Sequence, residues 1–279
     1  MNVNLSDLSA FADDIQTLKF HNTIEQLVAT VELDLEVIIK WLKGSGLKVN
    51  ESKTELCLFY KKDHHPIQIR VGNEILTTKN TINVLGVIFD AKLQWAPHIS
   101  HATTRANTAL CAIKLIKKYF SKLELLGLLT SNFYSILFYN SEIWHIPSLK
   151  GNLKRMILRE SSKGIRSCLT HSDPGISFIN LHKNNNRAVP DQYMKYKHSL
   201  LLYSLYNDKE FSLDWVSLNM QHQFMNRSSL FSISQTNRLK VGNNILTNRL
   251  SLINGMIPLS WLNLSRDSFK IKCKEKFLL

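Results

Sequence analysis

Short runs of apolar residues alternate with polar ones over the first 95 residues of the chain. Residues 8–11 and 15–20 are two such runs on either side of an acidic pair, which predicts a β-hairpin with Asp13 and Asp14 at its bend. From residue 24 to residue 42 the apolar positions recur at steps of three and four, as in an amphipathic helix. Residues 22–25 have the polar start and acidic third position of a capping box, and Gly44 and Gly46 mark the end. The order expected here is therefore hairpin, helix and then strand.

Three more β segments are expected before residue 95. Residues 56–60 are almost continuously apolar, as a buried strand would be. Residues 67–71 and 74–76 alternate around Gly72-Asn73, which predicts a second hairpin. Residues 83–90 are apolar and β-branched and predict one further strand.

The pattern becomes α-helical from Pro97 onward. One apolar stripe at helical spacing contains Ala102, Ala106, Ala109, Leu110, Ile113, Ile116 and Tyr119. Residues 123–138 supply a second apolar helix. Beyond residue 149 the chain is expected to be mostly helical, with loops at the polar runs 183–187 and 235–238. A Tyr-rich helix at 193–206 could stack on bases, but aromatic helices more often belong to a core.

Basic residues outnumber acidic ones, 35 to 22, which gives a net charge of +13 and a pI near 9.6. This balance favours polyanionic partners without identifying a site for them. The cations cluster in two places: Lys114, Lys117, Lys118 and Lys122 in one helix, and Lys150, Lys154, Arg155, Arg159, Lys163 and Arg166 in the next polar stretch. Arg155, Arg159 and Lys163 are four residues apart and share one helix face. That face is either a phosphate-binding surface or simply a solvated one.

Cysteine and histidine spacing gives no sign of a metal centre. Cys57, Cys111, Cys168 and Cys273 are isolated, which fits structural thiols in a reducing intracellular compartment, cytoplasm or nucleus. His98 and His101 lack a carboxylate or cysteine partner at ligand spacing and are expected to be surface or capping residues, as are His64 and His65. Neither a signal peptide nor an apolar run of about 18 residues is present, so neither secretion nor a membrane span is expected.

The acidic pair is the strongest candidate for chemistry. Adjacent carboxylates behind an apolar strand are the hard oxygen ligands that a magnesium-dependent phosphoryl-transfer site needs. Side chains alternate along a strand, so Asp13 and Asp14 diverge, and one can face a metal while the other binds a second metal or a nearby donor. A bare Asp-Asp pair is more often part of a turn or a helix cap, and that alternative stays open at this point.

Four blocks of the sequence resemble one known family. Phe11-Ala12-Asp13-Asp14 is similar to an F/Y-x-D-D catalytic box, and residues 41–55 are similar to the W…GL.lN..KT block that follows it. Residues 85–99 are similar to an LGv.iD..L.w..Hi block, and residues 254–270 to a tail that often closes such reading frames. From the catalytic box onward, the chain resembles the reverse transcriptases of non-LTR retrotransposons, the LINE-like and jockey-like elements.

The resemblance implies an α+β fold: the C-terminal half of a right-hand polymerase palm at residues 1–95, a helical thumb at 96–148 and a mostly helical extension at 149–279. It implies nucleotidyl transfer on two Mg²⁺ ions, with an RNA template, a DNA primer and deoxynucleoside triphosphates as partners. Asp13 would be a metal ligand, Asp14 a shared or supporting acid, and Lys53 the group that stabilises the departing pyrophosphate. Residues 84–89 would hold the primer end. Lys114, Lys117, Lys118, Lys154, Arg155, Arg159 and Lys163 would contact nucleic acid.

The chain departs from the family pattern ahead of the catalytic box. Only ten residues precede Phe11, and Asp7 would lie about 20 Å from Asp13 on an extended strand, too far to share an ion. Asp90 is a formal alternative ligand on another strand. A fragment with little or no polymerase activity of its own is therefore expected. Two other classes stay open: a non-catalytic nucleic-acid-binding module and a degenerate transposon relic.

Overall fold

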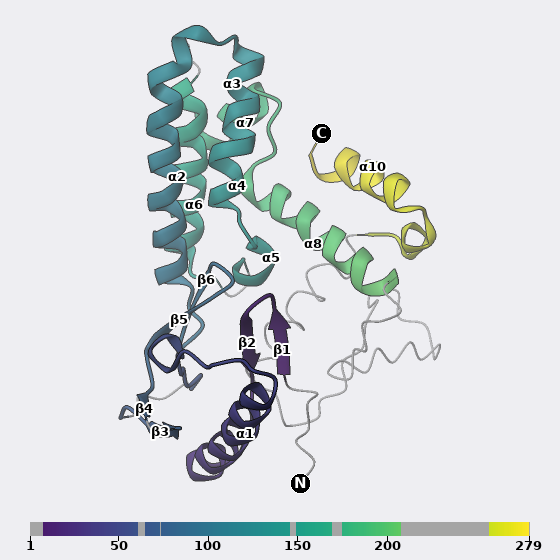
Figure 1. Cartoon of the computed structure of the whole chain (residues 1–279). Helices are drawn as coiled ribbons and strands as arrows, with labels where there is room; N and C mark the ends of the chain where they lie inside the picture. Colours follow the sequence, from purple (N-terminus) through teal and green to yellow (C-terminus); the bar gives the residue numbers. More distant parts are fainter. Residues whose placement is uncertain are drawn as a thin grey trace. The chain divides into compact units, whose positions relative to one another are not determined.

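A computed structural model describes residues 8–60, 65–72, 74–145, 149–168, 175–207 and 257–278 of the 279-residue chain. The chain divides into two compact units, Met1–Leu93 and Gln94–Leu279. The described part of the first unit holds three two-stranded antiparallel sheets and one long helix, and that of the second unit is helical (Figure 1). The predicted α+β class is confirmed, while the palm, thumb and extension stay a prediction.

The predicted hairpin around the acidic pair is present. Strands β1 (Leu8–Phe11) and β2 (Asp14–Thr17) pair in antiparallel register, and Phe11 lies opposite Asp14. Ala12 and Asp13 make the two-residue turn between the strands. A connection this short fixes the register of the pair, because it leaves no slack for the strands to slip.

Helix α1 (Ile24–Gly44) forms where the sequence predicts, but its N-cap is Thr23, one residue later than the capping box expected at residues 22–25. The Thr23 hydroxyl caps its start by accepting a hydrogen bond from the Gln26 amide at 3.3 Å. At its end Gly46 adopts a left-handed conformation, with φ +74°, and the Leu47 amide donates to the Leu42 carbonyl at 2.9 Å. This bond, together with the Gly46 amide to the Lys43 carbonyl at 3.1 Å, is a Schellman motif.

The remainder of the first unit contains two more hairpins and one loop where a strand is expected. Strands β3 (Gln68–Val71) and β4 (Glu74–Thr77) form the second predicted hairpin. The single strand predicted at 83–90 is wrong: β5 (Thr81–Val84) and β6 (Val87–Asp90) pair with each other. The cause is the turn between them, where Leu85 and Gly86 both have positive φ, as a tight hairpin turn requires.

The strand predicted at residues 56–60 is also wrong. This segment makes isolated main-chain bonds, from the Lys79 amide to the Leu56 carbonyl at 2.7 Å and from the Tyr60 amide to the Ala91 carbonyl at 3.2 Å. It has no regular strand partner within the described residues. Apolar content alone therefore did not make it a strand, because a strand also needs a continuous row of backbone partners.

The second unit is built around long helices. In chain order its elements are α2 (Ala96–Ile116), η3 (Lys117–Tyr119), α3 (Lys122–Leu128), the π-helical η4 (Leu129–Tyr134), α4 (Ser135–Leu137), α5 (Ser141–Trp144), α6 (Gly151–Cys168), α7 (Phe178–Asn184), α8 (Pro190–Asn207), η5 (Leu259–Asn263) and α10 (Arg266–Phe277). Helices α2 and α6 lie side by side and run in the same direction (Figure 1). The hydrogen bonds between the two segments follow the same order along both: Asn107 bonds Glu160, and further toward the C-terminal ends Lys117 bonds Ser167.

The core of this unit lies between α2, α6 and the α3–η4–α4 segment. Ala106, Leu129, Phe133 and Ile165 are fully buried there. The apolar stripe predicted for the first helix is confirmed as far as Ile113 but wrong at its end, where Ile116 and Tyr119 are exposed. Tyr119 lies beyond the end of the helix, in η3, so it no longer keeps the periodicity that would turn it inward.

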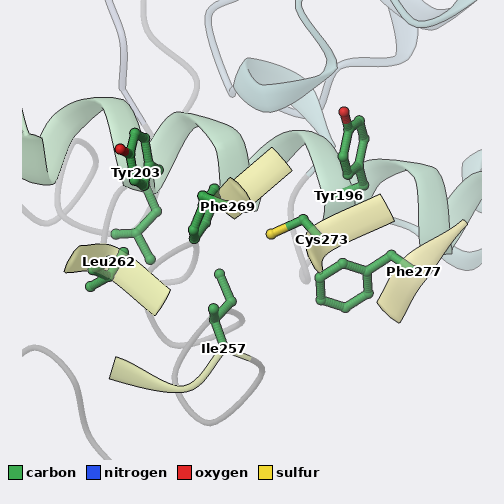
Figure 2. Packing of buried hydrophobic residues seen from close by; sticks show 8 residues of the cluster. Tyr196, Tyr203, Ile257, Leu262, Phe269, Cys273 and Phe277 are labelled. Atoms are coloured by element: carbon green, nitrogen blue, oxygen red, sulfur yellow. The ribbon is translucent and has the colours of Figure 1, made fainter. Parts of the chain in front are cut away.

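A second buried cluster joins α8 to the C-terminal helix α10. Tyr196 and Tyr203 of α8 lie beside Phe269, Cys273 and Phe277 of α10 (Figure 2). The rings of Tyr203 and Phe269 stack with their centroids 4.4 Å apart, and the Tyr203 hydroxyl donates to the Leu264 carbonyl at 2.7 Å. The Tyr-rich helix therefore contributes to a core, with its polar hydroxyl satisfied. The polar run at 235–238 and residues 254–256 of the tail block lie outside the described residues.

The expectation of a surface or capping role is wrong for His98. Its side chain is buried in the second unit, and its ring centroid lies 5.6 Å from that of Trp144. Burial, followed by the charge of nearby His101, lowers the pKa of His98 to about 4. His64 lies outside the described residues. In the part of the chain that the structure describes, every helix is too short or too polar to cross a membrane.

Candidate functional site

The acidic pair lies at the two-residue turn between β1 and β2. Asp13 and Asp14 are both exposed, and so is the neighbouring Phe11, with 66% of its surface accessible. Ala12 has φ +54°, a conformation that costs an L-residue roughly 1–2 kcal/mol. Strained backbone of this kind is tolerated where a turn must hold side chains in a particular direction.

The two carboxylates have no hydrogen-bonding or ion-pair partner among the side chains that the structure describes. Among the described residues neither Asp13 nor Asp14 makes a side-chain hydrogen bond or ion pair, so both can accept an external ligand. The chain that leaves the hairpin is instead fixed to α1 by Lys19, whose ammonium lies 2.6 Å from Asp34, and by His21, which bonds Thr30 at 2.9 Å. The hairpin is thus tied to the helix while its acidic turn stays free.

The donor set fits a hard divalent cation, although it is small. Mg²⁺ keeps several waters and is commonly held by one or two carboxylates together with substrate phosphates. No group of three His, Cys, Asp or Glu side chains with metal-binding geometry occurs within the described residues. Asp90 lies at the end of β6, opposite Thr81, and Asp7 lies outside the described residues.

Lys53 is exposed on a separate turn, η2 (Glu51–Lys53), whose shape depends on Asn50. The Asn50 carbonyl accepts bonds from the Lys53 amide at 3.1 Å and from the Thr54 hydroxyl at 3.0 Å. The Asn50 side chain accepts a third bond, from the Ser52 hydroxyl at 2.7 Å. Within the described residues no hydrogen bond or ion pair joins Lys53 to the acidic pair, so its predicted role stays a prediction.

The predicted cations of the second unit lie on α2, η3 and α6. Lys154, Arg155, Arg159 and Lys163 are exposed on α6, the last three on a common face. Arg159 and Lys163 both contact the buried Glu160, at 3.2 and 3.4 Å, and Asn107 of α2 donates to the same carboxylate at 3.0 Å. Burial raises the pKa of Glu160, but these three donors together lower it below its ordinary value.

Lys114 and Lys117 approach α6 from the end of α2. The Lys117 ammonium donates to the Ser167 carbonyl at 3.2 Å. Burial raises the pKa of the Cys168 thiol, and the charges of Lys114 and Lys117 partly oppose that rise, which places both lysines near the end of α6. The structure therefore places these two lysines near the C-terminal end of α6, while Lys154 lies in the first turn of that helix.

The sequence predicted a second helix from residue 123, but it did not identify the capping box that starts this helix, α3. Ser121 and Glu124 form a capping box: the Ser121 hydroxyl accepts from the Glu124 amide, and the Glu124 carboxylate accepts from the Ser121 amide at 2.8 Å. The spacing of a serine followed three residues later by a glutamate was the available signal. It starts a new helix and leaves Tyr119 exposed at the junction.

Comparison with known proteins gives one distant relative. The chain is 24% identical over 168 residues to the probable RNA-directed DNA polymerase from transposon BS of Drosophila melanogaster. The match covers 58% of this chain and 18% of that relative. No family model and no solved structure matches the chain. The similarity supports a distant, reverse-transcriptase-like relationship.

Proposed function

We propose that this chain carries the catalytic hairpin of an RNA-directed DNA polymerase of a non-LTR retrotransposon, together with a helical surface for the template and primer. One observation carries the proposal: two adjacent, exposed carboxylates, unpaired among the described residues, follow Phe11-Ala12 at a two-residue hairpin turn. The similarity to a transposon polymerase supports it. The chain spans 18% of that relative's length, so the activity of the whole polymerase is part of the proposal.

In this proposal Asp13 is a direct ligand of Mg²⁺, and Asp14 is the shared or supporting acid. Metal ions in such a site lower the pKa of an attacking hydroxyl and neutralise charge on a leaving pyrophosphate. The contribution of the chain is to hold two carboxylates ready at a fixed turn. Because neither pairs with another side chain that the structure describes, no such ion pair has to break before a cation binds.

Lys53 is proposed to stabilise the negative charge on the departing pyrophosphate. Its turn is held by three hydrogen bonds to Asn50, which restricts the main chain at Lys53. A lysine ammonium is a compact point charge with three donors, which suits a phosphate oxygen. That Lys53 lies close to Asp13 and Asp14 in the working polymerase is part of the proposal.

The helical surface is proposed to bind the phosphates of template and primer. Arg155, Arg159 and Lys163 span about 12 Å along one face of α6, since a helix rises 1.5 Å per residue. Arg159 and Lys163 share one carboxylate, Glu160, so their positive charge exceeds the negative charge beside them. Partial neutralisation of this kind positions the cations and leaves donors for phosphate oxygens.

The salt dependence of binding tests this surface. The full chain would be titrated against a fluorescent RNA–DNA primer–template duplex at several salt concentrations, with anisotropy as the readout. We expect the triple substitution R155Q, R159Q, K163Q to weaken binding and to reduce the slope of log affinity against log salt by up to about three, because each lost phosphate contact removes about one.

The matched control removes the same charge from the first unit, by K40Q, K43Q and K48Q. We expect it to leave the slope near that of the unsubstituted chain. Equal losses in both variants would mean that net charge alone drives binding, and an unchanged slope in the α6 variant would contradict a phosphate-binding role for this face.

A nucleic-acid-binding module without catalysis is the second candidate. It is favoured by one observation, that the described residues contain no cluster of three metal-binding side chains. Such a module would show the same salt dependence and no effect of Mg²⁺ beyond that of ionic strength. Specific cation binding at Asp13 and Asp14 would favour the first candidate instead.

A further inference from the structure

The junction between α2 and α3 forms an exposed end of the second unit, visible where these helices meet (Figure 1). It comprises the last turn of α2, η3 and the first turn of α3. We call it the tip surface and define it by five apolar side chains, Leu115, Ile116, Tyr119, Phe120 and Leu123, and four lysines, Lys114, Lys117, Lys118 and Lys122.

The apolar side chains of the tip surface are unusually accessible. Leu115 and Leu123 are each 80% exposed, and Tyr119 is 73% exposed. Single exposed hydrophobic residues are ordinary, but five within nine positions at one end of a helical unit are typical of a binding surface.

The charge of the tip surface is predominantly positive, with four lysines against one acid, Glu124, in the first turn of α3. No Asp or Glu occurs from residue 91 to residue 123, and the next acid along the chain is Glu124. Its carboxylate already accepts bonds from the Ser121 hydroxyl at 2.7 Å and the Ser121 amide at 2.8 Å. The Lys118 ammonium lies 4.9 Å from the centroid of the Tyr119 ring, so a cation and an aromatic face are held together.

These features fit one class of partner: a flexible polyanion that also offers flat apolar faces. We propose that the tip surface binds single-stranded nucleic acid, with an unpaired base stacked on Tyr119 and phosphates contacted by the surrounding lysines. The inference rests on the proposed function, because the same unit carries the proposed duplex-binding face of α6. Base faces are hidden inside a duplex, whereas a single strand can turn a base onto a protruding aromatic ring.

The test compares two probes on the full chain by fluorescence anisotropy at one salt concentration: a 12-nucleotide single-stranded RNA and the primer–template duplex. Tyr119→Ala is expected to weaken binding of the single strand about tenfold, because stacking on one aromatic side chain contributes on that order, and to leave duplex affinity unchanged. Tyr119→Trp is expected to retain or improve single-strand binding. Tyr139→Ala, at another exposed tyrosine, is the matched control and should change neither affinity.

The other outcomes each overturn the inference. Equal losses with both probes, or no loss with either, would show that Tyr119 does not stack on a base. Loss of single-strand affinity in Tyr119→Trp would point to a lost hydroxyl contact instead of stacking. Binding to vesicles with anionic phosphatidylserine that depends on Leu115 and Leu123, with RNA affinity unaffected, would make the tip a membrane-binding surface. If the unsubstituted chain binds neither the single strand nor the duplex, the proposed function and the inference both fail. If it binds the duplex, but Tyr119→Ala binds the single strand as well as Tyr139→Ala does, the inference alone fails.

Discussion

At the scale of single residues, the arrangement of the acidic turn depends on Ala12. Its positive φ lets two strands reverse within two residues, which leaves Asp13 in the turn and Asp14 at the start of the next strand. The sequence predicted the hairpin from apolar runs on both sides of the acids. It could not predict that Ala12 would adopt a left-handed conformation, because this conformation is strained for alanine and is usual for Gly or Asn.

His98 makes stability depend on pH. In an unfolded chain its imidazole takes up a proton near pH 6.5, whereas burial against Trp144 lowers the pKa of the folded group to about 4. Between these values the unfolded state binds more protons, so the free energy of unfolding falls as the pH falls from 7 toward 4. Urea denaturation at pH 7 and pH 5 measures the loss.

We expect that loss to be smaller in H98Q than in the unsubstituted chain, and unchanged in H21Q, where the histidine is exposed. Part of the loss should persist in H98Q, because burial also lowers the pKa of His145 to about 4. An identical pH dependence in H98Q and the unsubstituted chain would mean that His98 is not held neutral in the folded state.

At the scale of secondary-structure elements, local sequence signals predicted most of the helices and hairpins of the first unit. Thr23, Gly46 and the apolar steps between them gave α1 its bounds, and the alternation around Gly72 gave the β3–β4 hairpin. The turn at Leu85-Gly86 was missed because its leucine is an unusual residue for positive φ. The pairing of α2 with α6 through Asn107 and Glu160 joins residues 53 positions apart, and no local pattern encodes such a contact.

Close packing of α6 against η4 gives a prediction at this scale. A Cβ atom at Gly164 would lie 2.7 Å from Cε1 of the fully buried Phe133 ring. Gly164→Ala should gain about 1 kcal/mol of helix propensity but lose about 1–3 kcal/mol through overpacking, so we expect net destabilisation. The free energy of unfolding, from chemical denaturation, is the measurement.

Gly127→Ala is the matched control, because Gly127 is also helical but has open space around its Cβ position. It should raise the free energy of unfolding by up to about 1 kcal/mol. A Gly164→Ala variant as stable as Gly127→Ala would contradict the close contact between α6 and the Phe133 ring.

At the scale of the whole molecule, the two units differ in how much apolar surface they bury. Among the described residues of the first unit, Leu42, Ile69, Val71 and Val87 are the buried hydrophobic side chains, whereas Phe11 and Trp41 are more than 60% exposed. The second unit has the larger core, around Phe133 and Phe269. Burial of apolar surface is the main favourable term in folding, so the first unit should be the less stable one.

We therefore expect amide hydrogens of β3, β4 and α1 to exchange with solvent faster than those of α2 and α6 under native conditions. Hydrogen–deuterium exchange followed by mass spectrometry of peptides from both units measures this difference. Equal protection in the two units would mean that the first unit gains stability from contacts other than its own buried side chains.

The most direct test of the central claim is cation binding at the hairpin. The amide NMR signals of an isotope-labelled chain would be followed during titration with Mn²⁺, a paramagnetic substitute for Mg²⁺, and then during competition with Mg²⁺. The account predicts selective broadening of signals from residues 8–17, reversed by Mg²⁺ and abolished in the variant D13N, D14N, but retained in D267N, which removes an exposed carboxylate from α10. Broadening elsewhere in the chain with none at this turn, or broadening at the turn that persists in D13N, D14N, would contradict the assignment of these two carboxylates as the metal ligands.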